Sequence, residues 1–161
     1  MGSEFLTSPF DNLLKPVDDH LIVHNELMSS LILGNKIQIH TSEHGIPDLD
    51  TTKIVIIGIP ENRNSIDYLG DELNLNEIRK SFYNLYPGNW STEIADLGNL
   101  ILGENVEQTY GRIISMLSIL FEKNIIPIII GGSHDLLYAN YRAYDSFKST
   151  VNIVNIDSNF D

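Results

Sequence analysis

Three short runs of β-branched residues, separated by segments with helical periodicity, constrain the fold of this chain most strongly. They read KIVIIGIP at 53–60, IIPIIIGG at 125–132 and VNIVNI at 151–156. Apolar runs of this length are typical of strands that are covered on both faces, as in parallel α/β sheets. Pro127 has no N–H group to donate, so we place it at the start of its strand. A further short strand is expected in TEIADLG, at 92–98.

The segments between these strands carry apolar residues at helical spacing. Helices are expected over 18–33, 73–86, 105–124 and 134–146. The second carries Leu75, Ile78, Phe82 and Leu85 on one face, and Asn105 is placed to cap the third. Strands that alternate with helices imply βαβ crossovers, and therefore a mainly parallel sheet with helices packed against it.

Three regions are expected along the chain. Residues 1–9, which contain GSEF, are interpreted as a cloning-derived or disordered start and are left out of the fold. Residues 10–52 should form a helix and an extended arm, and residues 53–161 an α/β domain.

Composition excludes several classes of protein. The chain has 161 residues, with 22 acidic and 10 basic side chains and a net charge of −12 at pH 7. The scattered basic residues argue against nucleic acid as a partner. No apolar stretch approaches the roughly 20 residues of a membrane-spanning helix, so no membrane contact is expected. The absence of cysteine rules out disulfides and thiolate metal sites and is compatible with a cytoplasmic location.

Four polar residues follow the predicted strands and form a candidate metal site. His134 comes directly after IIIGGS, and Asp157, Asn159 and Asp161 alternate after the last run. Alternate residues of an extended chain point to one side, and parallel strands end at the same edge of a sheet. Imidazole and carboxylate donors suit Mn²⁺ or Zn²⁺, and the carboxylates favour Mn²⁺. Judged by spacing alone, the same residues could instead be helix caps and solvated acids.

The remaining histidines are weaker candidates. His20 and His24 lie four residues apart on a predicted helix, a spacing that can bind metal, but no third ligand accompanies them. We therefore expect surface or partly buried side chains there. His40 and His44 flank a predicted loop and are expected to be solvated.

Two of these motifs resemble those of the ureohydrolases, the family of arginase, agmatinase and formimidoylglutamase. GGSHD is similar to the first metal motif of that family, Gly-Gly-Asp-His-Ser, and DSNFD is similar to the second, Asp-Ala-His-x-Asp. The separation of about twenty residues also fits. The resemblance covers roughly 53–161, and formimidoylglutamase-like proteins are the most similar subgroup. It implies a three-layer α/β/α fold with a mainly parallel sheet.

The resemblance also implies a chemistry. In the family, a hydroxide held between two Mn²⁺ ions attacks the carbon of a guanidino or formimino compound and a C–N bond is hydrolysed. By this resemblance His134, Asp157 and Asp161 are metal ligands, with Asp157 bridging both ions. Asn159 stands where the family has a histidine, so it is a weak or vestigial ligand and the second ion is bound poorly. The expected partner is a small-molecule substrate; homo-oligomerisation is left open.

The third metal motif of the family, an Asp-x-Asp pattern, has no counterpart after DSNFD. The chain is therefore expected to be the N-terminal portion of a truncated arginase-like fold, inactive by itself. The alternative is a homologue that keeps the fold without catalysis and serves as a binding or scaffold protein, which Asn159 favours. A nucleotide-binding module is a more distant alternative, because GIPENR and IIIGGSHD lack a complete phosphate-binding pattern.

Overall fold

A computed structural model describes residues 9–10, 12–66, 70, 73–147, 150–154 and 156 of the chain. At its centre, β3 (Ile54–Gly58) lies between β4 (Ile94–Leu100) and β5 (Ile126–Ile130) and is parallel to both. Two short strands pair with the other edge of β4: β1 (Leu14–Lys15) runs antiparallel and β2 (Gln38–Ile39) parallel. The sheet is thus mainly parallel, in the order β1-β4-β3-β5.

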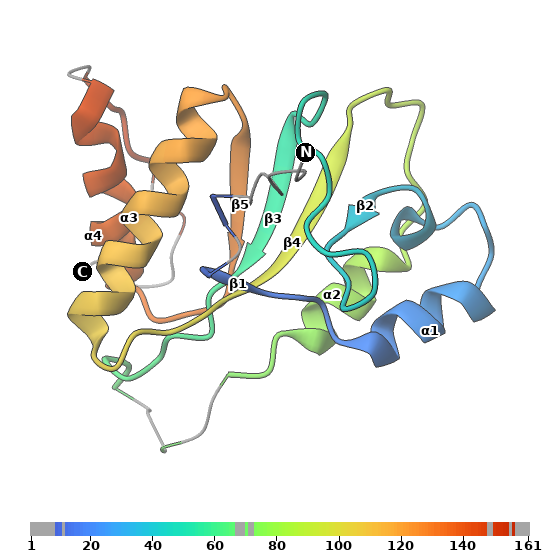
Figure 1. Cartoon of the computed structure of the whole chain (residues 1–161), viewed down its shortest axis with the longest axis horizontal. Helices are drawn as coiled ribbons and strands as arrows, with labels where there is room; N and C mark the ends of the chain where they lie inside the picture. The colour runs from blue at the N-terminus through green and yellow to red at the C-terminus, as the bar shows by residue number, and fades with distance from the viewer. Residues whose placement is uncertain are drawn as a thin grey trace, which may run out of the picture.

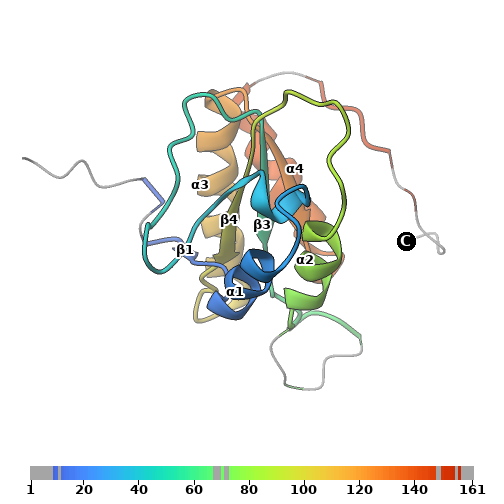
Figure 2. The same cartoon turned by 90° about the vertical axis from the view of Figure 1, so that its right-hand side faces the viewer.

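Helices cover both faces of this sheet (Figures 1 and 2). On one face lies α3 (Val106–Glu122), and α4 (Leu136–Ala143) packs against it. On the other face lies α2 (Asn76–Tyr83), with α1 (Asp19–Leu27) beside it. Two 3₁₀ turns, Leu33–Asn35 and Tyr144–Phe147, follow α1 and α4. The predicted α/β architecture with helices on both sides of a mainly parallel sheet is confirmed.

The main hydrophobic core lies between the sheet and α3. The fully buried residues of α3 recur at helical spacing and are Ile113, Met116, Leu117 and Leu120. They pack against inward residues of β3 and β4, which include Val55, Ile57, Ala95 and Leu97. Asn105 caps α3 as predicted, because its Oδ1 accepts from the N–H of Gln108 at 2.8 Å. The core contacts and the cap therefore fix the position of α3 beside the loops at the lower end of the sheet in Figure 1.

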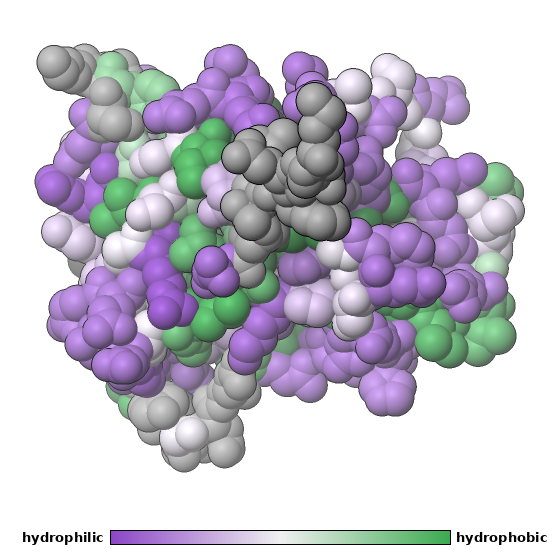
Figure 3. Space-filling view, viewed as in Figure 1, coloured by the Kyte–Doolittle hydropathy of each residue, from purple (hydrophilic) through white to green (hydrophobic). Residues whose placement is uncertain are grey.

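The first helix is shorter than its periodicity predicts. α1 ends at Leu27, and the chain then turns through Ser29, where Asn35 Nδ2 donates to the carbonyls of Asn25 at 2.8 Å and Ser29 at 3.1 Å. Serine competes for backbone hydrogen bonds and is a weak helix former, which explains the early end. Figure 3 shows apolar side chains exposed over α1, where Val23, Leu27 and Met28 face solvent. Among the described residues, none of the helices has the length and hydropathy to cross a bilayer.

The face of α2 that packs on the sheet differs from the predicted one. Leu75 is buried and Phe82 is half-buried against the core, as expected, but Ile78 and Leu85 are exposed. The residues that α2 buries fully are Arg79 and Tyr83. The polar groups of Arg79 and Tyr83 bind Asp96 of β4, which holds that side of the helix against the sheet. Apolar periodicity alone could not indicate this, because the buried surface is built around an ion pair.

The predicted strand at 151–156 is the main correction. Residues 151–154 and 156 are not in a strand, and Ile153, Val154 and Ile156 are 55%, 84% and 95% exposed. Within the described part of the chain β5 is the edge strand on the side of the sheet opposite β1, and its Ile126 and Ile128 are 63% and 43% exposed. A β-branched run is buried only where it pairs with a neighbouring strand and helices cover its faces. In the described residues no strand pairs with the outer edge of β5, and the described part of the run is exposed.

Candidate functional site

The connectivity of the strands reverses direction at β3. From β3 the chain crosses through α2 to β4 on one side, and from β4 it returns through α3 to β5 on the other side of β3. In open α/β sheets ligands bind at the carboxyl ends of the strands where the order reverses in this way. That point lies between the loop after β3, at 59–66, and the loop after β5, at 131–135.

Two glycines set the conformation of the loop that carries His134. Gly131 and Gly132 have φ of +83° and +93°, which L side chains rarely adopt. A Cβ on Gly132 would lie 2.0 Å from Leu136 Cδ1 and 3.1 Å from the carbonyl oxygen of Ile59. After this turn the N–H of Ser133 donates to the carbonyl of Glu61 at 2.9 Å. The loop is therefore held against the loop after β3, and His134 is exposed at the edge of the sheet.

The carboxylate of Asp135 accepts hydrogen bonds from three parts of the chain: α3, the loop after β3 and the loop after β5. Its Oδ2 accepts from the hydroxyl of Tyr110 on α3 and, at 3.0 Å, from Nδ2 of Asn64 in the loop after β3. Its Oδ1 accepts from the hydroxyl of Ser133. Burial alone would raise the pKa of the Asp135 carboxyl, but the bonds from Ser133, Tyr110 and Asn64 outweigh burial and lower it. Asp135 is thus an anion at neutral pH.

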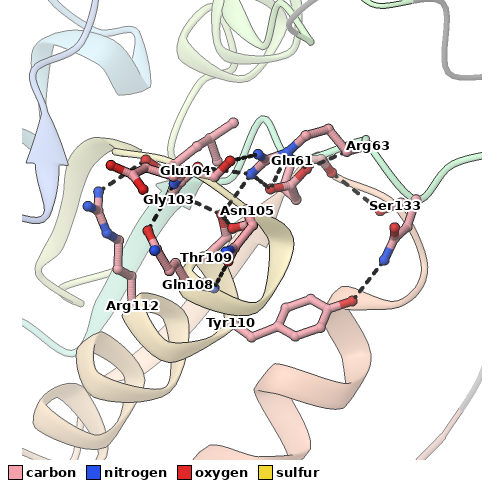
Figure 4. A network of polar contacts seen from close by, with 12 residues as sticks. Glu61, Arg63, Gly103, Glu104, Asn105, Gln108, Thr109, Tyr110, Arg112 and Ser133 are labelled. Atoms are coloured by element: carbon pink, nitrogen blue, oxygen red, sulfur yellow. Dashed lines mark hydrogen bonds and ion pairs between the residues drawn. The ribbon is translucent and has the colours of Figure 1, made fainter.

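A second polar network fixes the loop after β3 (Figure 4). The carboxylate of Glu61 is fully buried and accepts from Nη2 of Arg63 at 2.5 Å and from Nε at 2.9 Å. The same guanidinium donates to the carbonyls of Gly103 at 3.1 Å and Glu104 at 2.9 Å, which follow β4, and to the hydroxyl of Thr109 on α3. Arg63 therefore links the loops after β3 and β4 to the start of α3.

The two networks leave negative charge at this edge. Burial acts to raise the pKa of Glu61, but hydrogen bonds from the side chain and N–H of Arg63, with that of Thr109, lower it overall. For Tyr110, burial and the bond to Asp135 raise the pKa to about 12, so its hydroxyl remains a donor. The positive charge of Arg63 is compensated by Glu61, whereas Asp135 is bonded only to neutral donors among the contacts above. A divalent cation at this edge would meet a favourable field.

Of the predicted metal ligands, the structure describes only His134. Asp157, Asn159 and Asp161 lie outside the described residues. Among the described residues, no three His, Cys, Asp or Glu side chains come together as metal ligands would. The donor types still fit Mn²⁺, because His134 is an accessible imidazole at the carboxyl end of a strand and the other donors are oxygens.

Sequence reasoning missed the roles of Glu61, Arg63, Asn64 and Asp135. Their position immediately after two strands was the available signal, since polar residues at such places line the edge of a parallel sheet. His40 was predicted to be solvated, and this was wrong. Its side chain is buried, with Nδ1 at 2.9 Å from the carbonyl oxygen of Leu97, because the strand pairing of β2 with β4 draws the arm onto the sheet.

Comparison with known proteins agrees with this geometry. The sequence model of the arginase family matches residues 52–161. The chain belongs to the arginase family. Formimidoylglutamase from Halalkalibacterium halodurans is 26% identical over 116 residues, which are 66% of this chain and 36% of that protein.

Solved structures of arginase-family proteins show the same fold. Formiminoglutamase from Trypanosoma cruzi, in a structure with Mn²⁺, has a TM-score of 0.60 at 22% identity, covering 79% of this chain and 45% of that one. Formimidoylglutamase from Bacillus subtilis has a TM-score of 0.53 at 19% identity, covering 70% and 43%. The chain therefore spans less than half the length of the arginase-family relatives that it matches.

Proposed function

We propose that the protein containing this chain hydrolyses a C–N bond of a linear amidine, a guanidino or formimino compound, with Mn²⁺ as cofactor. The observation that carries the proposal is the place of His134: an exposed imidazole at the carboxyl end of β5, beside the point where strand order reverses, in a chain of the arginase family. The matched formimidoylglutamase and the Mn²⁺-containing formiminoglutamase structure support the reaction class and the metal.

His134, Asp157 and Asp161 would hold the metal, with Asn159 as a weak or vestigial ligand. When bound, the ion supplies a Lewis acid that polarises the substrate and acidifies water. The Gly131-Gly132 turn directs His134 to the edge of the sheet. For Asp157 to join it, the segment before Asp157 must run alongside β5, which is the predicted strand pairing.

The described residues also favour the charge of such a substrate. Amidines and guanidines are cations near neutral pH, and the Asp135 carboxylate, whose pKa is lowered, lies at the edge of the sheet. Arg63 does not oppose this attraction, because its guanidinium donates to Glu61 and to main-chain carbonyls. The edge therefore attracts both the metal ion and a cationic substrate.

A second candidate is a non-catalytic homologue that binds a partner through the same fold. Asn159 favours it, because an amide oxygen replaces the imidazole that the family motif implies. The two candidates differ in one measurable property, since only the enzyme needs a well-occupied metal site.

The deciding experiment measures Mn²⁺ binding and product release by the complete protein. Arginine, agmatine and formiminoglutamate are supplied in turn, and urea and formamide are assayed, with His134→Asn as the site variant. We expect release from one of these substrates, and loss of both release and Mn²⁺ affinity in the variant. Tight Mn²⁺ binding that His134→Asn leaves unchanged would exclude the proposed site. Residues 1–161 alone are expected to release neither product above a blank.

A further inference from the structure

Asp135 occupies the N-cap position of α4 but does not cap the helix. An aspartate at this position ordinarily accepts from a backbone N–H of the first turn. Here no such side-chain bond is formed. The N–H groups of Leu136, Leu137 and Tyr138 are satisfied instead by the carbonyls of Ser133, His134 and Asp135, at 3.0 to 3.1 Å. The carboxylate is therefore available for other partners.

Those partners come from outside the helix. Tyr110 on α3 and Asn64 in the loop after β3 donate to Oδ2, and Ser133 donates to Oδ1. Asn64 Nδ2 also donates to the Tyr110 hydroxyl at 3.2 Å, so Asp135, Tyr110 and Asn64 are each hydrogen-bonded to the other two. Tyr110 is in turn packed edge-on against Tyr138 of α4, with ring centroids 5.8 Å apart. Tyr110 therefore donates to Asp135 from α3, and Asn64 donates from the loop after β3.

Both residues that flank His134 are held by this arrangement. Ser133 is fixed on one side by its N–H bond to the Glu61 carbonyl at 2.9 Å, and Asp135 on the other by Tyr110 and Asn64. His134 itself is exposed between them. A loop anchored at both ends of a ligand residue loses less conformational entropy when the ligand binds.

From this geometry we infer that Asp135, held by Tyr110 and Asn64, is a positioning residue that fixes His134 in its metal-binding orientation before the ion arrives. The inference rests on the proposed function for the identity of the ion. It assigns to Asp135 no contact with substrate or metal. Tyr110 and Asn64 act through Asp135, and the Gly131-Gly132 turn gives the loop the shape that they hold.

The test uses Asp135→Asn and Tyr110→Phe in the complete protein. Asp135→Asn keeps the size of the side chain and weakens the hydrogen bonds that it accepts, and Tyr110→Phe keeps the ring but removes the hydroxyl that donates to Asp135. Asp145→Asn is the matched control: it removes the same charge just past α4, where Asp145 is paired only with exposed Arg142 in the contacts described. Calorimetric titration with Mn²⁺ should give about tenfold weaker binding in the two site variants, as for other groups that orient a metal-binding histidine. The control should bind as wild type does, and all should melt within a few degrees of one another.

A second measurement does not depend on metal. In metal-free protein, hydrogen exchange of the peptide spanning 131–138 should be faster in both site variants and unchanged in Asp145→Asn. Wild-type affinity in the site variants, with unchanged exchange, would overturn the inference and leave the proposed function standing. A wild-type protein that binds no Mn²⁺ would overturn the proposed function. In that case faster exchange in both variants still supports positioning of His134 by Asp135, and unchanged exchange removes it.

Discussion

Arg79 of α2 and Asp96 of β4 form an ion pair in the interior, with Nε 2.9 Å from Oδ2 and both side chains buried. Asp96 also accepts from the hydroxyl of Tyr83 at 2.7 Å and from the N–H of Gly98 at 2.8 Å. Arg79 donates further to the Asn99 side chain at 2.7 Å and to the Gly98 carbonyl at 2.8 Å. The pair is therefore embedded in a network that joins α2 to the carboxyl half of β4.

Asp96→Ala should destabilise the fold by about 3–5 kcal/mol, because it leaves the Arg79 guanidinium buried without its counterion. Urea unfolding of wild type and variant measures the difference in free energy. Arg142→Ala is the control: it breaks the exposed pair with Asp145, 2.6 Å apart, and should change stability by less than about 1 kcal/mol. Similar losses in the two variants would show that the interior network contributes little.

Glu61→Gln should make the protein less sensitive to acid. The pKa of Glu61 is lower in the folded state than its ordinary value of 4.5, so the unfolded state takes up the proton first as pH falls. The stability that this carboxylate contributes is complete above pH 4.5 and is lost as pH falls through the lower folded value. At pH 7 the variant should lose on the order of 2 kcal/mol, because Arg63 keeps only part of its bonding. Parallel unfolding free energies of variant and wild type between pH 7 and 3 would contradict this.

Gly132→Ala should destabilise the protein and displace the His134 loop. Its φ of +93° is strained for alanine, which costs on the order of 1–3 kcal/mol, and the added Cβ would meet Leu136 and the Ile59 carbonyl. Gly45→Ala separates the two effects, because Gly45 also has a positive φ of +70° but no atom within 4 Å of the new Cβ. Urea unfolding should show the larger loss at Gly132. Equal losses would mean that the turn has room for a side chain.

Residues 151–154 and 156 form no strand in the structure, but the proposed metal site requires that this segment pair with the outer edge of β5 in the complete protein. Such pairing would bring the side chains of Asp157 and His134 within about 8 Å, the span of two ligands on one ion. Backbone amides of 151–156 should then exchange slowly with deuterium. Val154→Pro removes one N–H and should abolish that protection and weaken Mn²⁺ binding. Fast exchange in the wild type would leave the last three candidate ligands without a means of reaching His134.

Asn159→His should strengthen Mn²⁺ binding in the complete protein, because imidazole is a better donor than a neutral amide oxygen. Asp157 and Asp161 keep the charge that attracts the ion, so the change isolates one ligand. Calorimetric titration should show tighter binding or a higher stoichiometry in the variant. Identical titrations would show that Asn159 is already an adequate ligand, and the non-catalytic alternative would lose its main support.

Local apolar patterns were sufficient to predict the elements that form the main core. α3, with its Asn105 cap and its stripe through Ile113, Leu117 and Leu120, and the buried strand at 54–58 follow directly from hydrophobic periodicity. The apolar residues that these elements bury are those of their own hydrophobic patterns. The mainly parallel sheet follows from their alternation.

Features that depend on partners far along the chain were not predictable in this way. Arg79 is buried only because Asp96 lies opposite, and His40 only because Leu97 offers a carbonyl. Asp135 has the sequence position of a helix cap, but tertiary contact with Tyr110 decides where its carboxylate points. The β-branched run at 151–154 has strand propensity without a covered neighbour, and propensity by itself does not bury it.

In the part of the chain that the structure describes, the outer edge of β5 has no partner strand, and this matters during translation. The ribosome adds residues 131–156 in roughly 1 to 5 s, at about 5–20 residues per second. During that interval β5 has been synthesised but the segment proposed to pair with it has not. Ile126 and Ile128 are among the solvent-facing side chains of β5. An uncovered strand edge can pair with any extended chain nearby, including a neighbouring nascent copy on the same messenger. The yield of folded protein in a cell should therefore depend on elongation rate and on chaperones that shield β-branched segments.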